Sequence, residues 1–149
     1  MSRHQDRSAR TACIIDGDNI AGGGQIDVSQ VACVLERLSA LNTGWSVTFA
    51  MQRRLAERYM TAYAGQGWAI RFCSMAPDAA DDELLEAAGD YVARGVRDLV
   101  VVSGDHAFAV LAQHARLHVC TYRSSLSKRL RMAATTITYL DDLVSPAAA

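Results

Sequence analysis

The segment Leu99-Val-Val-Val102 is a continuous apolar run, and it constrains the fold of this chain more than any other feature. A run without polar alternation is typical of a central parallel strand, because helices cover both faces of such a strand. Further strand-like segments occur at 12–16, 46–51, 69–73, 118–122 and 136–140. Segments with helical spacing separate them, at 27–41, 53–64, 81–94, 108–114 and 126–134. The alternation predicts an α/β fold, a three-layer sandwich with a mostly parallel central sheet.

The composition is that of an ordinary globular domain, because 50% of the 149 residues are hydrophobic and 21% are charged. We expect one domain at 11–144, between a flexible N-terminal tail at 1–10 and a C-terminal tail at 145–149. No apolar run approaches the ~20 residues that a membrane span requires, and the polar N-terminal segment has no apolar core of a signal peptide. We therefore expect a cytoplasmic protein with no membrane association.

The four cysteines, Cys13, Cys33, Cys73 and Cys120, lie far apart in the sequence. They form no C-x-x-C pair, and no histidine lies at ligand spacing from them. Zinc sites and disulfide frameworks both rely on such spacing, so neither is supported. We expect the cysteines to be free thiols packed as small apolar side chains.

The charges are unevenly distributed, although the net charge is only −1. Acidic residues predominate from 76 to 98, whereas the segment 106–140 contains none and carries several basic side chains. If folding brings the two segments together, an acidic pocket would lie beside a basic rim, which suits a metal ion and bound phosphates. Otherwise the two segments are solvated surfaces, and charge alone favours this second interpretation.

Two aspartates end predicted strands that this fold class places near each other. Asp16 ends the strand at 12–16, and Asp105 follows the valine-rich strand. In open parallel sheets ligands bind outside the carboxyl ends of the strands, and the first and fourth strands are neighbours in the commonest orders. Two carboxylates at such a point repel each other unless a cation lies between them, and their hard oxygens suit Mg²⁺ or Mn²⁺. Each aspartate alone is equally explained as an Asx-turn or a helix cap.

The third predicted helix begins with two further aspartates, Asp81 and Asp82. Acids in a first helical turn satisfy free amide donors and complement the helix dipole, which requires no further function. Asp81 shares the helical phase of the apolar residues Leu84 and Ala88, so it is predicted to point inward. Asp82 is rotated toward solvent, and we favour Asp81 as the site residue.

Three motifs follow one another along the chain: Asp16-Gly-Asp18-Asn19 after a strand, Ala80-Asp81 entering a helix, and Ser103-Gly104-Asp105-x-x-Phe108 after the valine-rich strand. Over about residues 12–143 this order resembles the NYN domain of the PIN-like nuclease superfamily, including the LabA-like bacterial proteins. The resemblance implies a PIN-like, Rossmann-like fold and a metal-dependent ribonuclease that hydrolyses RNA phosphodiesters with Mg²⁺ or Mn²⁺. The matching acid positions are Asp16, Asp81 and Asp105, which become the candidate catalytic residues.

The resemblance also implies roles for neighbouring residues. Asp18 and Asp82 join the three acids as candidate metal ligands. Asn19 and Ser103 are candidate substrate-binding residues, which either contact phosphate or orient a carboxylate. The basic side chains that would hold the RNA backbone are Arg123, Lys128, Arg129 and Arg131. The chain departs from the family at Ala107, where the pattern commonly has a second acid, so the site is expected to be one ligand short unless Asp18 substitutes.

Two other function classes fit parts of the sequence. Asp16-Gly-Asp18 also resembles the entry motif of haloacid-dehalogenase-like phosphatases, but the only lysine, Lys128, follows Asp105, which is the wrong order for that family. Alternatively, with Ala107 in place of an acid, the chain is an RNA-binding or regulatory module with little turnover, and a symmetric homodimer is compatible with that role. Incubation with RNA and with small phosphomonoesters separates the three functions.

Overall fold

The computed structural model describes residues 10–76 and 78–144 of the chain. The two expected tails therefore lie outside the described residues, apart from Arg10. The backbone carbonyl of Arg10 accepts hydrogen bonds from the N–H groups of Arg97 and Asp98, at 2.9 Å and 3.1 Å. The backbone of Arg10 is thus tied to the start of the fourth strand segment.

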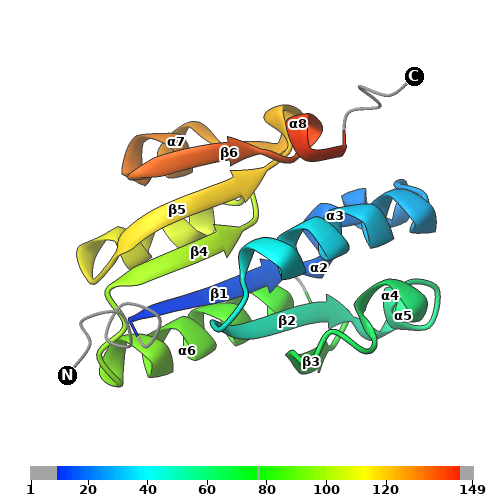
Figure 1. Cartoon of the computed structure of the whole chain (residues 1–149), viewed down its shortest axis with the longest axis horizontal. Coiled ribbons are helices and arrows are strands. Elements are labelled where there is room, and N and C mark those ends of the chain that lie inside the picture. The colour runs from blue at the N-terminus through cyan, green and yellow to red at the C-terminus, as the bar shows by residue number, and fades with distance from the viewer. Residues whose placement is uncertain (1–9, 77, 145–149) are drawn as a thin grey trace.

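The centre of the molecule is a sheet of six strands, all of them parallel (Figure 1). The strands are β1 (Thr11–Asp16), β2 (Ser46–Gln52), β3 (Ala69–Cys73), β4 (Asp98–Val102), β5 (Arg116–Thr121) and β6 (Thr136–Tyr139). Their order is β3-β2-β1-β4-β5-β6, so the chain reverses its direction of winding between β1 and β4. The predicted neighbourhood of the first and fourth strands is confirmed, and in the register Ile15 lies beside Val102.

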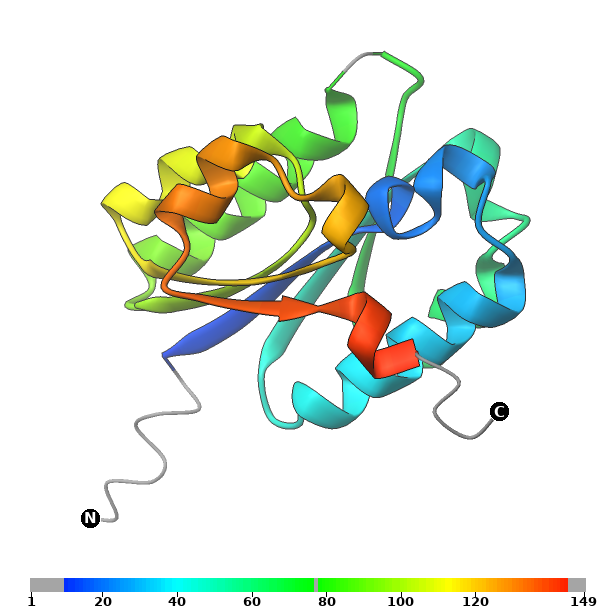
Figure 2. The ribbon, with the colours of Figure 1, turned by 90° about the horizontal axis from the view of Figure 1, so that it is seen from above.

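Helices cover both faces of the sheet, as Figure 2 shows, and this confirms the predicted three-layer α/β sandwich. One face carries α3 (Val28–Leu41), α5 (Met60–Tyr63) and α8 (Leu140–Val144). The other face carries α6 (Ala79–Ala93), the 3-10 helix η2 (His106–Gln113) and α7 (Lys128–Ala133). The remaining short helices are α2 (Gly17–Ile20), η1 (Gly22–Gly24), α4 (Arg53–Ala56) and η3 (Arg123–Ser125).

Successive side chains of the central strands enter opposite cores, because strand side chains alternate between the two faces. In β4, Val100 and Val102 pack in the core beneath α3, whereas Leu99 and Val101 pack in the core beneath α6. All four of these side chains are buried. Burial on both faces explains why this segment contains no polar alternation.

The single helix expected at 53–64 is wrong, because the structure has two short helices, α4 and α5, in its place. Tyr59 lies between them with non-helical backbone angles and a fully buried ring. Its hydroxyl donates a hydrogen bond to the carbonyl of Ile26. Burying this large side chain against α3 and satisfying its hydroxyl outweigh the local preference for a continuous helix.

Local structure also differs from expectation toward the C-terminus. The helix expected at 126–134 begins only at Lys128, after the turn η3. Ser127 caps this helix, because its hydroxyl accepts from the N–H of Leu130 at 3.2 Å. The extended piece expected at 136–140 ends at Tyr139, and the chain continues as α8, whose first residue, Leu140, is buried in the core.

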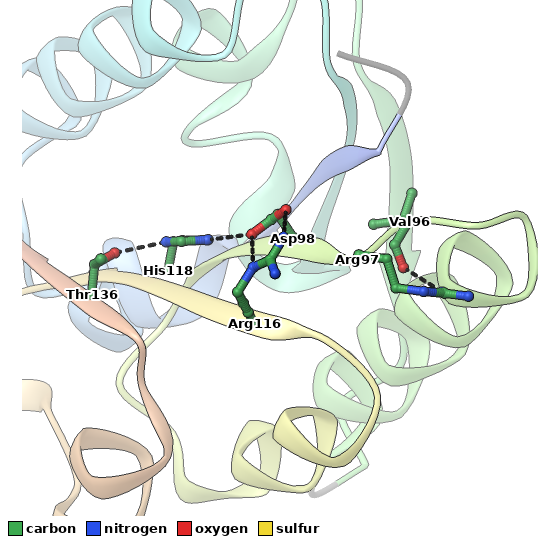
Figure 3. A network of polar contacts seen from close by, with 6 residues as sticks. All are labelled: Val96, Arg97, Asp98, Arg116, His118 and Thr136. Carbon is green, nitrogen blue, oxygen red and sulfur yellow. Dashed lines mark hydrogen bonds and ion pairs between the residues drawn. The ribbon is translucent and has the colours of Figure 1, made fainter. Parts of the chain in front are cut away.

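A polar network ties the strands together at the amino edge of the sheet (Figure 3). The carboxylate of Asp98 accepts from Arg116 Nε at 2.8 Å and from its terminal nitrogen at 2.7 Å. Asp98 also pairs with His118 Nε2 at 2.9 Å, and His118 Nδ1 lies 2.8 Å from the hydroxyl of Thr136. The network thereby links the starts of β4, β5 and β6.

Two expectations from composition can be compared with the structure. All four cysteines are free thiols, as predicted. Within the described ranges, no helix is both long enough and apolar enough to cross a membrane.

Candidate functional site

An acid-lined cavity of about 320 Å³ lies at the carboxyl edge of the sheet, where β1 and β4 diverge. Figure 2 shows α2, η3 and the start of α6 gathered around the end of β1. The acidic residues that line the cavity are Asp16, Asp18, Asp78, Asp81 and Asp105. Among the described residues that line it, none is lysine, arginine or histidine. Folding therefore brings the three predicted acids, which are far apart in the sequence, to one cavity with a strongly negative wall.

Asp16 is buried at the end of β1 and caps the following helix α2. Its Oδ1 accepts from the backbone N–H of Asn19 at 3.2 Å, and its Oδ2 accepts from the hydroxyl of Ser103 at 2.9 Å. Burial raises the pKa of Asp16 from 3.8 to about 6, although these two hydrogen bonds oppose the rise. The charges of Asp18 and Asp105 raise it further. Asp16 thus caps α2 and lines the cavity at the same time.

Asp105 follows β4 and faces the same cavity. Its backbone N–H donates to Ser103 Oγ at 3.1 Å, and its Oδ1 accepts from the N–H of Ala107 at 2.8 Å, which caps η2. Nδ1 of His106 lies 3.5 Å from the same carboxylate. These contacts orient the Asp105 side chain at the cavity wall.

Asn19 and Ser103 support the acids in different ways. The side-chain oxygen of Asn19 accepts from the N–H of Gly104 at 3.2 Å and lies 3.4 Å from the hydroxyl of Thr121, its second donor. Asn19 therefore fastens the loop after β4 to α2 while lining the cavity. Ser103 is only 1% exposed, so substrate cannot reach it, and it orients Asp16 instead. Of the two predicted substrate-binding residues, the structure leaves only Asn19 accessible from the cavity.

Asp81 lies in the first turn of α6 and is buried, as its helical phase predicts. Burial raises its pKa from 3.8 to about 7, with further contributions from the charges of Asp16, Asp105 and Asp78 and from a hydrogen bond with Asp105. Burial is therefore the main cause of the rise, and the charges of the neighbouring carboxylates add to it. Asp82 is exposed and does not line the cavity, so the structure does not support it as a metal ligand.

Asp18 occupies the side of the cavity next to β2. Its Oδ1 accepts from the backbone N–H of Gln52 at 3.0 Å, and burial raises its pKa. Ala107, at the position where the family pattern has a further acid, does not line this cavity; it lines a neighbouring groove. The structure thus places Asp18, and not position 107, beside the other acids.

Sequence reasoning missed three polar residues that line the cavity, Gln52, Asp78 and Ser125. Asp78 precedes α6 and has a left-handed backbone with φ of 64°, which non-glycine residues other than asparagine and aspartate rarely adopt. Its place beside the proline at position 77 in an acidic segment is the only sequence signal that pointed to it. Gln52 ends β2, the strand next to β1, and the rule that strand ends carry ligands would have found it.

The predicted RNA-binding cations separate into three groups. The guanidinium of Arg123 pairs with Asp142 at 3.0 Å and lies 4.3 Å from the ring centre of Tyr139, so it is held away from the cavity. Lys128 and Arg129 line the neighbouring groove between η2 and α7. Arg131 lines neither hollow within the described parts of the chain. None of the four predicted cations lines the acidic cavity, and Lys128 and Arg129 alone line the groove next to it.

The carboxylate oxygens of the cavity are of the kind that bind a hard divalent cation. They are not arranged, however, as a complete set of direct metal ligands. In the described parts of the chain, no group of three or more His, Cys, Asp or Glu side chains is placed to hold one ion. Mg²⁺ in proteins commonly keeps several waters and binds through one or two carboxylates. Burial is the main cause of the raised pKa values of Asp16 and Asp81, and the charges of neighbouring carboxylates raise both further. The donor set thus suits a cation held mainly through water.

No family model matches the chain, and no curated protein matches its sequence. Its fold is similar to the crystal structure of a protein of unknown function from Vibrio parahaemolyticus, with a TM-score of 0.67 and 14% sequence identity. The likeness covers 96% of this chain and 98% of that chain. It shows the fold over nearly the whole length, while the NYN resemblance stays a prediction. Fold and cavity together define an α/β protein with an acidic site at the switch point of a parallel sheet.

Proposed function

We propose that this chain is a metal-dependent ribonuclease that hydrolyses RNA phosphodiesters in the acid-lined cavity. The observation that supports the proposal best is the convergence of Asp16, Asp81 and Asp105, from three separate segments, on one cavity without a cationic lining residue. Clustered carboxylates with raised pKa values are typical of functional sites, because a stable fold has no reason to collect them. The motif resemblance to NYN domains points to the same chemistry.

Each residue has a distinct task in this proposal. Asp16 and Asp105 are the principal ligands of Mg²⁺ or Mn²⁺, and Asp81 completes the site directly or through water. Ser103 holds the Asp16 carboxylate in place with its hydrogen bond of 2.9 Å. Asn19 lines the cavity beside them and is the residue available to contact a phosphate oxygen. When bound, a divalent cation supplies an activated water and polarises the phosphodiester.

The acid pKa values define the working conditions of the proposed site. Asp16 and Asp81 must both be ionised to hold a cation, and their pKa values are raised to about 6 and about 7. Metal binding releases these protons, so affinity for the cation falls as the pH drops below about 7. We therefore expect cleavage to require neutral or alkaline pH.

Incubation of the purified protein with labelled single-stranded and structured RNA tests the proposal. Cleavage is expected with Mn²⁺ or Mg²⁺ and not with a chelator. Asp16→Asn and Asp105→Asn, purified in parallel, should be inactive, whereas Asp90→Asn, an exposed acid on α6, should cleave like the parent. Cleavage in chelator, or equal cleavage by all three variants, would refute the metal-dependent mechanism.

One observation favours a second candidate, an RNA-binding module with little turnover. The described chain contains no ready three-residue metal group, as a weakly active or inactive domain would show. In that case the protein binds RNA equally well with chelator and leaves it intact at every metal concentration. The phosphatase alternative has less support, because the only lysine lines the neighbouring groove and not the acidic cavity.

A further inference from the structure

A second hollow of about 840 Å³ lies between η2 and α7, beside the acidic cavity. Its wall combines cations with exposed apolar side chains. Lys128 and Arg129 come from α7, as does Met132, which is 75% exposed, and Val110 of η2 is 50% exposed. The two hollows meet along the chain, because Asp105 lines the cavity and the next residue, His106, lines the groove. A ligand in this groove therefore lies next to the proposed active site.

The cations of the groove are available to an external anion. Neither Lys128 nor Arg129 forms an ion pair with any described residue, and no acidic residue occurs between His106 and Leu140. Arg123 provides the contrast, because Asp142 already neutralises it. Two cations without an acidic partner, in a groove next to the acidic cavity, can bind successive phosphates of a nucleic acid strand.

The backbone fixes this groove relative to the acids. The N–H of Ser127, just before α7, donates to the carbonyl of Gly104 at 2.9 Å. Gly104 is in close contact with the same segment, because a Cβ at this position would lie 2.1 Å from the carbonyl oxygen of Ser125. Gly104 directly precedes Asp105, so the cations of α7 are held at a set position from the cavity wall.

The apolar members identify the form of nucleic acid that the groove accepts. Unstacked bases of a single strand can pack their faces on exposed side chains such as Met132 and Val110, whereas a duplex hides its base faces. Cations that track the backbone beside apolar surfaces that take bases are the usual combination in proteins that bind single strands. Resting on the function proposed above, we infer that the groove between η2 and α7 binds the single-stranded flank of the RNA whose phosphodiester enters the acidic cavity.

Binding without cleavage tests this inference directly. A labelled single-stranded RNA of about 12 nucleotides is titrated with the full chain in chelator, and fluorescence anisotropy reports affinity. K128Q/R129Q should bind about 20-fold more weakly at about 0.1 M salt, and its salt slope should fall by about 1.4, since two phosphate contacts are lost. M132S should weaken binding about fivefold and leave the salt slope unchanged.

The matched control is R37Q/R94Q, which removes the same charge from an exposed position of α3 and from the exposed residue that directly follows α6. It should bind like the parent, and a duplex of the same sequence should compete poorly. The inference is overturned if K128Q/R129Q binds as well as this control, or if the duplex competes as well as the single strand. The experiments distinguish an error in the inferred RNA binding by the groove from an error in the proposed nuclease activity. A protein that cleaves RNA with unchanged affinity in K128Q/R129Q contradicts only the groove, and one that loses binding in K128Q/R129Q but never cleaves contradicts only the nuclease.

Discussion

The hydroxyl of Ser103 donates a 2.9 Å hydrogen bond to Oδ2 of Asp16, across a separation of 87 positions in the sequence. Oγ of Ser103 also accepts a 3.1 Å hydrogen bond from the backbone N–H of Asp105. Ser103 therefore joins the ends of β1 and β4 and sets the position of one carboxylate relative to the other. Because the hydroxyl is buried and fully engaged, its role is to orient the acids and not to bind substrate.

Replacement of Ser103 by alanine should shift the pH dependence of the site upward. The hydrogen bond from Ser103 lowers the pKa of Asp16, so its loss leaves burial and the neighbouring charges to raise that pKa further. Calorimetry across a range of pH measures the Mn²⁺ affinity. As the pH is lowered, this affinity should begin to fall at a higher pH in Ser103→Ala than in the parent. Ser103→Thr retains the hydroxyl and should retain the parent profile. An unshifted profile in Ser103→Ala would show that the hydrogen bond does not tune the acid.

Asp16→Asn and Asp105→Asn should abolish cleavage and leave the protein folded. Asparagine caps helices as well as aspartate does, so the hydrogen bonds to Asn19 and Ala107 can persist. Removing a buried negative charge also relieves repulsion in the metal-free cavity. Thermal melting in chelator at about pH 8 should give Asp16→Asn a melting temperature at or above that of the parent. If both variants melt well below the parent, the aspartates are structural turn residues and the site assignment fails.

The metal-free protein should become less stable as the pH rises from about 4 to about 7. Asp16 and Asp81 have folded pKa values of about 6 and about 7, above the 3.8 expected when unfolded. In this range the native state binds more protons than the unfolded state, so rising pH favours unfolding. Melting in chelator should show the trend, and Asp81→Asn should flatten it. Saturating Mn²⁺ should reverse the trend by binding only the native state. If Asp81→Asn loses as much stability with rising pH as the parent does, groups other than Asp81 cause the loss.

Asp98 should make the protein more stable as the pH rises, at lower pH than the range in which Asp16 and Asp81 act. Hydrogen bonds from Arg116 and His118 lower its pKa from 3.8 to about 2, so the stability it provides is present above about pH 4 and is lost as the pH falls toward 2. Asp98→Asn should cost about 1 to 2 kcal/mol at neutral pH, after allowance for partial solvent screening. Urea unfolding at about pH 7 and at about pH 3 should show a smaller difference in Asp98→Asn than in the parent. Equal differences would mean that the network of Figure 3 contributes no net stability.

Gly104→Ala and Gly89→Ala should change stability in opposite directions. A Cβ on Gly104 would collide with the carbonyl of Ser125, which is backbone and must move with α7, so we expect a loss of about 2 kcal/mol or more. Gly89 lies within α6 with nothing in reach of a Cβ, so alanine should stabilise the helix by about 0.5 to 1 kcal/mol. Urea unfolding measures both. A Gly104→Ala protein as stable as the parent would show that the segment before α7 yields easily.

The sheet and the pair of strand-end acids could be predicted because both depend on local sequence. Uninterrupted apolar segments mark central strands, and the general rule for parallel sheets then places Asp16 beside Asp105. Asp81 followed from helical phase alone, and its burial confirms the argument. These inferences required no knowledge of how distant segments pack.

The features that sequence reasoning missed depend on contacts between distant segments. The break at Tyr59 results from a hydrogen bond to Ile26, on a different segment. Arg123 is neutralised by Asp142 on α8, a helix that was not predicted, so its pairing could not be foreseen. The close approach of the segment before α7 to Gly104, where a Cβ would lie 2.1 Å from the carbonyl oxygen of Ser125, also joins segments far apart in the sequence. The hydrophobic and polar pattern of a short segment contains no information about contacts with distant segments.

The strand order has a consequence for the timing of synthesis. β1 is made first yet lies at the centre of the sheet, and its neighbour β4 is made much later. Ser103, which orients Asp16, is added 87 positions later in the chain. Synthesis of that length takes roughly 4 to 17 s at about 5 to 20 residues per second. A nascent chain that stops short of Asp105 carries no assembled acid cavity, so translation itself delays whatever chemistry the cavity performs until synthesis has passed Asp105.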